Sequence, residues 1–177
     1  MKRTISILSA IIMALTTSCV GSKLEQSYNN QESKIDNYIS GKGDKYRSVR
    51  NGGANRLVLA EGEGEELERN GFVSFYYAGY TFSGSFSASN LFVTNHQETA
   101  ENANWNLTDA EYKIYEINMA EAKLIPGLRD GLVGVKAGEE CEILFSGKYG
   151  FGNEEFGMIP ANSAQLWKIW VVGVTND

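Results

Sequence analysis

The sequence predicts an α+β domain in which antiparallel strands surround one short helix. Several short runs are rich in β-branched and aromatic residues, as in residues 72–80 and 165–174, and this composition is typical of strands. By contrast, the segment that starts at Pro126 repeats apolar residues at helical spacing. A chain with several strands and one such helix favours the α+β class over alternating strands and helices.

Five strands are expected in the second part of the chain. They fall at residues 57–60, 72–80, 112–118, 140–146 and 165–174. The last run places Trp167, Ile169 and Val171 on one face, because side chains alternate along a strand. Lys168 and Trp170 point to the other face. One face of the sheet is therefore expected to be core and the other to be mixed.

The single short helix is expected to begin at Pro126. Proline fits the first helical turn because its missing N–H has no partner there. Leu128, Leu132 and Val135 then recur at helical spacing. Gly131 lowers the intrinsic helix propensity. We therefore expect packing against the sheet to stabilise this helix.

Residues 1–18 are expected to be a signal peptide. Lys2 and Arg3 precede an apolar run at residues 5–15, which is too short to span a bilayer as a stable helix. The small residues before Cys19 resemble a bacterial lipobox, in which the thiol is acylated and the chain is cut just before it. An ordinary secretory peptide is the alternative. Either interpretation predicts export, and the lipobox predicts an anchor at Cys19, on the outer membrane of the cell envelope.

No acidic run follows Cys19 that would act as a surface-export signal. We therefore expect the protein to face the periplasm. Residues 19–54 are polar and are expected to form a tether before a domain at residues 55–177. Within the tether, Leu24, Tyr28, Ile35, Tyr38 and Ile39 fall loosely on one helical stripe. A short helix lying on the domain or on a partner, and a solvated spacer, are both compatible with this pattern.

Charge and cysteine content exclude several classes of function. The 22 acidic residues outnumber the 16 basic ones, which disfavours binding to nucleic acid. If Cys19 is acylated, Cys141 is the only free thiol, and its alternation with Ile143 and Phe145 predicts a buried structural residue. His96 is the only histidine and has no cluster of ligands around it in the sequence. No metal or cofactor is expected.

An ordered series of short motifs carries a family resemblance. The pieces are Tyr77-Ala78-Gly79, Gly84-Ser85-Phe86, Leu124-Ile125-Pro126-Gly127-Leu128, Gly131-Leu132, Gly138-Glu139, Tyr149-Gly150-Phe151-Gly152 and Ile159-Pro160. In this order they resemble the FKBP-type peptidyl-prolyl cis-trans isomerases, over residues 55–174, in the form of a Bacteroidetes-like bacterial lipoprotein. The resemblance implies a half-open sheet of about five strands wrapped around the helix, and isomerisation of X-Pro bonds in exported proteins.

The resemblance also implies which residues form the site for the prolyl segment. The residues expected to act in catalysis are Tyr77, Phe86, Ile125 and Phe151, with the Ile125 N–H donating to a peptide carbonyl. The residues expected to bind substrate are Ser87, Tyr115, Leu124, Leu128, Ile159 and Trp167. Taken alone, Tyr115 and Trp167 are also explained by core packing, because aromatic residues at strand spacing are usually buried.

Three of these positions depart from the family pattern. Leu128 stands where the family usually has tryptophan, Ser87 where it has aspartate, and Phe151 where it has tyrosine. Loss of the tyrosine hydroxyl removes a hydrogen bond worth about 0.5–1.5 kcal/mol. These changes are expected to reduce the rate or to alter substrate preference. The alternative function is a catalytically weak chaperone or binding module of the cell envelope.

An insert at residues 90–107 separates the first motifs from the helix. It contains Phe92 and Trp105. The two aromatic side chains are compatible with a lid or partner surface beside the site, and equally with a surface loop that packs on itself.

Overall fold

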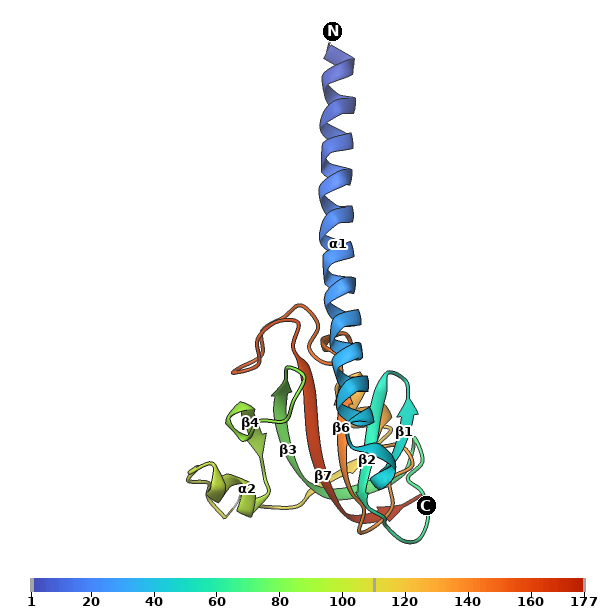
Figure 1. Cartoon of the computed structure of the whole chain (residues 1–177), viewed down its shortest axis with the longest axis vertical. Coiled ribbons are helices and arrows are strands. Elements are labelled where there is room, and N and C mark those ends of the chain that lie inside the picture. Colours follow the sequence, from blue (N-terminus) through green and yellow to red (C-terminus); the bar gives the residue numbers. More distant parts are fainter. Residues whose placement is uncertain (1, 110, 177) are drawn as a thin grey trace.

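The computed structural model describes the backbone of residues 2–109 and 111–176, and side chains from Gly21 onward. Its α-helices are α1 (Lys2–Ser40), α2 (Gln97–Asn102) and α3 (Pro126–Leu132). Its strands are β1 (Arg47–Asn51), β2 (Ala54–Ala60), β3 (Phe72–Phe82), β4 (Leu91–Thr94), β5 (Tyr115–Asn118), β6 (Glu140–Phe145) and β7 (Ala164–Thr175). The α+β class is confirmed: one sheet packs against α3 and against the C-terminal part of α1 (Figure 1).

The strands form one open antiparallel sheet in the order β1-β2-β6-β7-β3-β4. The long strands β3 and β7 pair along their whole length, from Phe72 with Thr175 to Phe82 with Ala164. The other edge of β3 is shared: β5 pairs with residues 72–75 and β4 with residues 78–80. The sheet does not close, because β1 lies at one end of the strand order, whereas β4 and β5, each paired with β3, lie at the other.

The described sheet has seven strands, two more than expected from the sequence. One of these is β1, which lies inside the range expected to be tether and pairs with β2. Its residues are mostly exposed, so it lacks the apolar alternation that marks a half-buried strand. The other is β4, which lies inside the insert at residues 90–107 and pairs with β3. The insert is therefore partly an extension of the sheet.

Each face of the sheet has its own core. On the face that holds α3, Phe75, Ile143, Phe145 and Ile169 are almost completely buried. Cys141 belongs to the same core, where burial raises the pKa of its thiol, and the prediction of a buried structural residue is confirmed. On the opposite face, α1 packs against Tyr80, Phe82, Leu144 and Leu166. The alternation predicted for residues 167–171 is confirmed.

Close approach to the sheet holds α3 in place. A side-chain carbon at Gly127 would collide with the ring of Phe145, and one at Gly131 would collide with Ile143. These two glycines lie four residues apart and so share one face of the helix. Pro126 occupies the first helical position, as expected. The glycines lower the helix propensity of this segment, but they also allow the close packing against the sheet that stabilises α3.

A buried ion pair fixes the C-terminal end of α3. The Arg56 guanidinium on β2 donates hydrogen bonds to the carbonyls of Gly131, Val133 and Gly134 at 2.8–3.1 Å. Its Nε lies 3.2 Å from Oε1 of Glu139, and both side chains are almost fully buried. Arg56 thus satisfies carbonyls that a helix end leaves without partners.

The C-terminal part of α1 lies on the sheet, whereas its N-terminal part extends away from the domain (Figure 1). Tyr28, Ile35 and Ile39 are buried, and Ile35 and Ile39 belong to the core of this face. Of the two possibilities for the polar segment, the helix lying on the domain is therefore observed. In the part of the chain whose side chains are described, no helix combines the length and apolarity needed to cross a bilayer. The side chain of Cys19 lies outside that part.

Candidate functional site: an aromatic cluster beside α3

Aromatic rings from three strands meet on the α3 face of the sheet. The ring centroids of Tyr77 on β3 and Trp167 on β7 are 5.9 Å apart. Tyr115 on β5 meets Tyr77 edge to face at 5.8 Å. These separations are typical of aromatic pairs that attract one another. Because β3 pairs with both β5 and β7, the sheet itself brings these three rings together.

Phe92 on β4 completes the aromatic cluster. Its ring meets that of Trp167 edge to face at 5.5 Å between centroids. The contact depends on Gly79, since a side-chain carbon there would approach within 2.7 Å of the Phe92 ring. Gly79 therefore admits Phe92 to the face that carries Tyr77 and Trp167. We call the four rings of Tyr77, Phe92, Tyr115 and Trp167 the aromatic cluster.

Hydrogen bonds from the end of β4 position Tyr77. Its backbone N–H donates to Oδ1 of Asn95 at 2.6 Å, and its carbonyl accepts from Oγ1 of Thr94 at 2.7 Å. Nδ2 of Asn95 donates in turn to the carbonyl of Lys113, just before β5. Burial, and then the neighbouring Tyr115, raise the pKa of the Tyr77 phenol. Tyr77 therefore keeps its proton at neutral pH and is a hydrogen-bond donor.

The residues around the start of α3 border the same core as the aromatic cluster. Leu124 and Ile125 are partly buried and pack against it. Leu128 is buried, with 5% of the residue exposed, and belongs to the core itself. Ile125 has extended backbone angles and is the N-cap of α3. Its N–H therefore takes no part in the intrahelical hydrogen bonds.

Phe151 and Ile159 lie in the long connection between β6 and β7, which we call the 147–163 loop. Phe151 stacks on Phe156 with ring centroids 4.6 Å apart. Ile159 is buried and exchanges two backbone hydrogen bonds with Phe156. Tyr149, near the start of the loop, packs against the core beside α3. The loop thus borders the α3 face through Tyr149, whereas the contacts of Phe151 and Ile159 described above are with Phe156 inside the loop.

Phe86 and Ser87 do not join the aromatic cluster. The Phe86 ring meets Tyr80 edge to face at 5.0 Å, and the ammonium of Lys168 lies 4.0 Å from its centroid. Tyr80 belongs to the core on the α1 face. Ser87 Oγ is hydrogen-bonded to Oγ of Ser89 in the turn that follows. The structure therefore places Phe86 on the face opposite Tyr77, and the place beside Trp167 is taken by Phe92.

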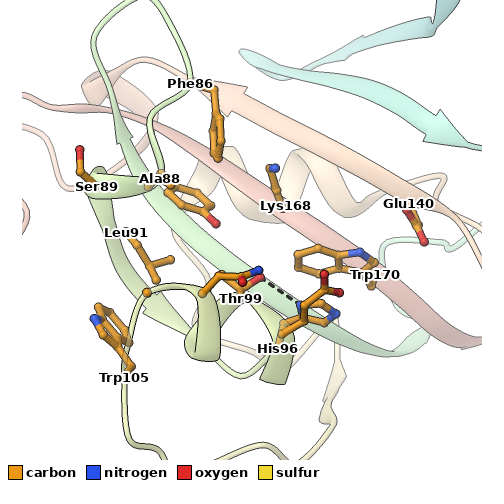
Figure 2. Close-up of a pocket in the computed structure, with 14 residues that line it drawn as sticks. Phe86, Ala88, Ser89, Leu91, His96, Thr99, Trp105, Glu140, Lys168 and Trp170 are labelled. Atoms are coloured by element: carbon orange, nitrogen blue, oxygen red, sulfur yellow. Dashed lines mark hydrogen bonds between the residues drawn. The ribbon is translucent and has the colours of Figure 1, made fainter.

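Phe86 borders a separate cavity of about 720 Å³ on that opposite face (Figure 2). Its walls include Tyr80, Trp105 and Trp170, and Lys168 lies between Phe86 and Trp170. The His96 ring is stacked flat on Trp170, with centroids 3.9 Å apart, and its Nδ1 is 3.0 Å from Oγ1 of Thr99. Burial lowers the pKa of His96, so the stacked ring is neutral at neutral pH. Trp105 thus borders this cavity and does not lie over the aromatic cluster.

Residues 64–172, more than half of the chain, match the family described as FKBP-type peptidyl-prolyl cis-trans isomerase. The chain belongs to this family. Its activity is therefore isomerisation of prolyl peptide bonds, and its substrates are proline-containing polypeptides.

Individual relatives of this FKBP-type isomerase are distant. The chain is 21% identical over 117 residues to FK506-binding protein 1 of Aspergillus oryzae, covering 66% of this chain and 94% of that protein. The fold is similar to that of FkpA from Escherichia coli, with a TM-score of 0.57, 18% identity, and coverage of 97% and 71% of the two chains. A peptidyl-prolyl isomerase from Pseudomonas syringae pv. tomato gives a TM-score of 0.59 at 15% identity, covering 86% and 96%.

Sequence reasoning missed Phe92 as a member of the aromatic cluster of this isomerase. The run at residues 91–94 contains three apolar residues and a threonine, which is a strand signal. It falls within the insert at residues 90–107, and the family resemblance instead assigns Phe86 of the Gly84-Ser85-Phe86 motif to the site. Only the pairing of Ala78 with Thr94 and Gly79 with Val93 shows which phenylalanine reaches Trp167.

Proposed function

We propose that the aromatic cluster, with the N–H of Ile125, is the site where this isomerase binds and twists the prolyl bond. The observation that carries this proposal is the meeting of Tyr77, Phe92 and Trp167 on the face that holds α3. An apolar surface of this kind suits a proline ring, and the start of α3 provides a backbone donor close to the same core.

Rotation about an X-Pro bond is slow because the amide resonance must be broken. In the twisted state the carbonyl loses its conjugation with the prolyl nitrogen, and the bond becomes less polar. An apolar, water-poor surface therefore favours the twisted state over the planar one. No covalent intermediate is needed. The aromatic cluster provides this environment, and the Ile125 N–H holds the peptide in register.

Two departures from the family pattern set the expected rate. Leu128 is buried in the core and replaces a flat indole with a branched aliphatic side chain. Phe151 offers no hydroxyl, so a hydrogen bond worth about 0.5–1.5 kcal/mol is absent from the 147–163 loop. Both changes hold the prolyl ring less closely. They support a second candidate function, in which binding of proline-containing segments exceeds their turnover.

Turnover of an X-Pro tetrapeptide by the purified protein tests the site and separates the two functions. We expect turnover above the uncatalysed rate, and a higher kcat/KM in the double variant Leu128→Trp/Phe151→Tyr. Val172→Ala, at an exposed position of β7, is the control for nonspecific effects of substitution on the sheet. If turnover appears only in the double variant, the natural protein is primarily a binder. If Tyr77→Ala, Trp167→Ala and Phe92→Ala all leave kcat/KM unchanged, the site lies elsewhere.

We further propose that the protein works on exported chains, from a lipid anchor at Cys19 in the cell envelope and on the periplasmic side. The support is the order of a basic start, an apolar run and small residues before Cys19. The long course of α1 would separate such an anchor from the isomerase domain (Figure 1). Metabolic labelling with a radioactive fatty acid tests this. We expect labelled protein in the membrane fraction and none for Cys19→Ser, whereas an unlabelled wild-type protein would contradict it.

A further inference from the structure

The side chain of Gln31 on α1 bridges the two ends of the 147–163 loop. Nε2 of Gln31 donates to the carbonyl of Asn162 at 2.7 Å, and Oε1 of Gln31 accepts from the N–H of Gly147 at 2.8 Å. Gly147 and Asn162 are the two ends of the loop. Gln31 therefore connects the two ends of the loop through hydrogen bonds, although it lies 116 residues before Gly147 in the chain.

Asn162 is fixed by two further hydrogen bonds. Its Nδ2 donates to Oγ of Ser27, one helical turn before Gln31, at 2.8 Å. Its backbone N–H donates to the carbonyl of Gly152 across the loop at 2.7 Å. Asn162 has a φ of 58°, in the left-handed region, which asparagine tolerates better than most residues. The turn at the end of the loop thus depends on its partners in α1.

The buried Gln165 connects the loop base to the aromatic cluster. A side-chain carbon at Gly150 would meet Nε2 of Gln165, so the loop backbone lies directly on this side chain. Gln165 is fully buried, and its Oε1 accepts from the indole N–H of Trp167 at 2.9 Å. A displacement of the loop base would therefore disturb the side chain that orients Trp167.

Apolar contacts set the position of Gln31 along the sheet. Ile35, one turn after Gln31, is fully buried on the α1 face, and Tyr28 is buried one turn before it. The hydrogen bonds of Gln31 are thus made by a helix whose register is already fixed. The salt bridge between Lys148 and Glu25 is exposed at 3.3 Å and adds little.

We propose that Gln31 is a positioning residue of the prolyl site: from α1 it holds the 147–163 loop in the arrangement that binds the substrate. The inference rests on the proposed function and on the assignment of Phe151 and Ile159, in this loop, to that site, which the family resemblance implies. When only a fraction of molecules has the loop in place, apparent affinity falls by that fraction. Loss of the Gln31 contacts therefore raises KM, whereas kcat for bound substrate changes little.

The test compares Gln31→Leu with Gln26→Leu, the same substitution at an exposed position of the same helix. With an X-Pro tetrapeptide, we expect Gln31→Leu to raise KM about threefold to tenfold, as expected for losing one or two hydrogen bonds, with kcat within about twofold. Gln26→Leu leaves both unchanged. Gln31→Glu keeps the acceptor for the Gly147 N–H and gives an intermediate KM.

Two further measurements separate a positioning role from simple destabilisation. Amide hydrogen exchange at Gly147 is expected to be faster in Gln31→Leu than in Gln26→Leu. Phe151→Ala reports on the loop itself. If Phe151→Ala leaves KM unchanged, the loop is not part of the site and the proposed assignment fails. If Phe151→Ala raises KM but Gln31→Leu matches Gln26→Leu, only the positioning role of Gln31 is overturned.

Discussion

The two faces of the sheet carry similar residues but are built differently. The α3 face is held by close packing at Gly127 and Gly131 and by the buried Arg56–Glu139 pair. The core of the α1 face contains Ile35 and Ile39 of α1, and hydrogen bonds of Gln31 and Ser27 also attach this helix to the domain. Both faces present aromatic rings, yet only on the α3 face do they lie beside a fixed helix start. Aromatic content alone therefore does not distinguish the two faces, whereas the neighbouring start of α3 does.

The largest expected effect is on the α3 face. Arg56→Met leaves the Glu139 carboxylate buried without its partner, and three carbonyls near the end of α3 lose their donor. Breaking a buried pair in this way costs about 3–5 kcal/mol of unfolding free energy. Urea denaturation measures the loss. Arg69→Met, which removes a largely exposed partner of Asp130, is the control and should cost about 1 kcal/mol or less.

A smaller loss of unfolding free energy is expected for a substitution on the α1 face. Ile35 is fully buried between α1 and the sheet, so Ile35→Ala removes apolar contacts and leaves a cavity. The expected cost is about 2–4 kcal/mol, with the lower end favoured because one helix can settle into the space. Asn37→Ala, at an exposed position of α1, is the control. If Ile35→Ala costs more than Arg56→Met in the same urea assay, the contrast between the two faces is wrong.

The buried carboxyl group of Glu139 makes the stability of the α3 face depend on pH. Burial raises the pKa of Glu139, and this effect outweighs the attraction of Arg56. A raised folded-state pKa means that the folded state holds this proton more tightly than the unfolded state. The stabilising contribution is then complete below the unfolded pKa of about 4.5 and is lost as the pH rises through the folded value.

We therefore expect the stability of the wild type, relative to Glu139→Gln, to fall as the pH increases from about 4.5 towards neutrality. Urea denaturation of both proteins at several pH values measures this difference. Exposed carboxylates contribute equally to both proteins and cancel. If the wild type instead becomes more stable relative to Glu139→Gln as the pH rises, the attraction of Arg56 for the Glu139 carboxylate outweighs the cost of its desolvation.

Much of the fold was accessible from the sequence because its signals are local. The helix start at Pro126, the burial of Cys141 and the alternation around Trp167 each follow from a few neighbouring residues. The strand β1 was missed because its side chains are mostly exposed, so it carries no apolar alternation. Its pairing with β2 is marked instead by the two-residue connection Gly52-Gly53, which is a hairpin signal.

The candidate site was predicted in part. Tyr77, Tyr115 and Trp167 lie together, and Leu124, Ile125 and Leu128 border the same core. Their catalytic and binding roles stay predictions. The order of the motifs points to Phe86, whereas the strand register set by β4 pairing with β3 brings Phe92 to Trp167, and motif order does not reveal register. The contact between Gln31 and the loop could not be predicted from the sequence either, because it joins residues far apart in the chain.

The central claim is that the prolyl site lies on the α3 face and includes Phe92. Comparing kcat/KM for Phe92→Ala and Phe86→Ala tests it most directly, because the same substitution is made on the two faces. Leu91→Ala, on β4 but in the core of the α1 face, controls for damage to that strand. We expect kcat/KM to fall roughly tenfold or more for Phe92→Ala, about 1.4 kcal/mol of transition-state stabilisation, and to stay within about twofold for Phe86→Ala. A large loss for Phe86→Ala with none for Phe92→Ala would contradict the account.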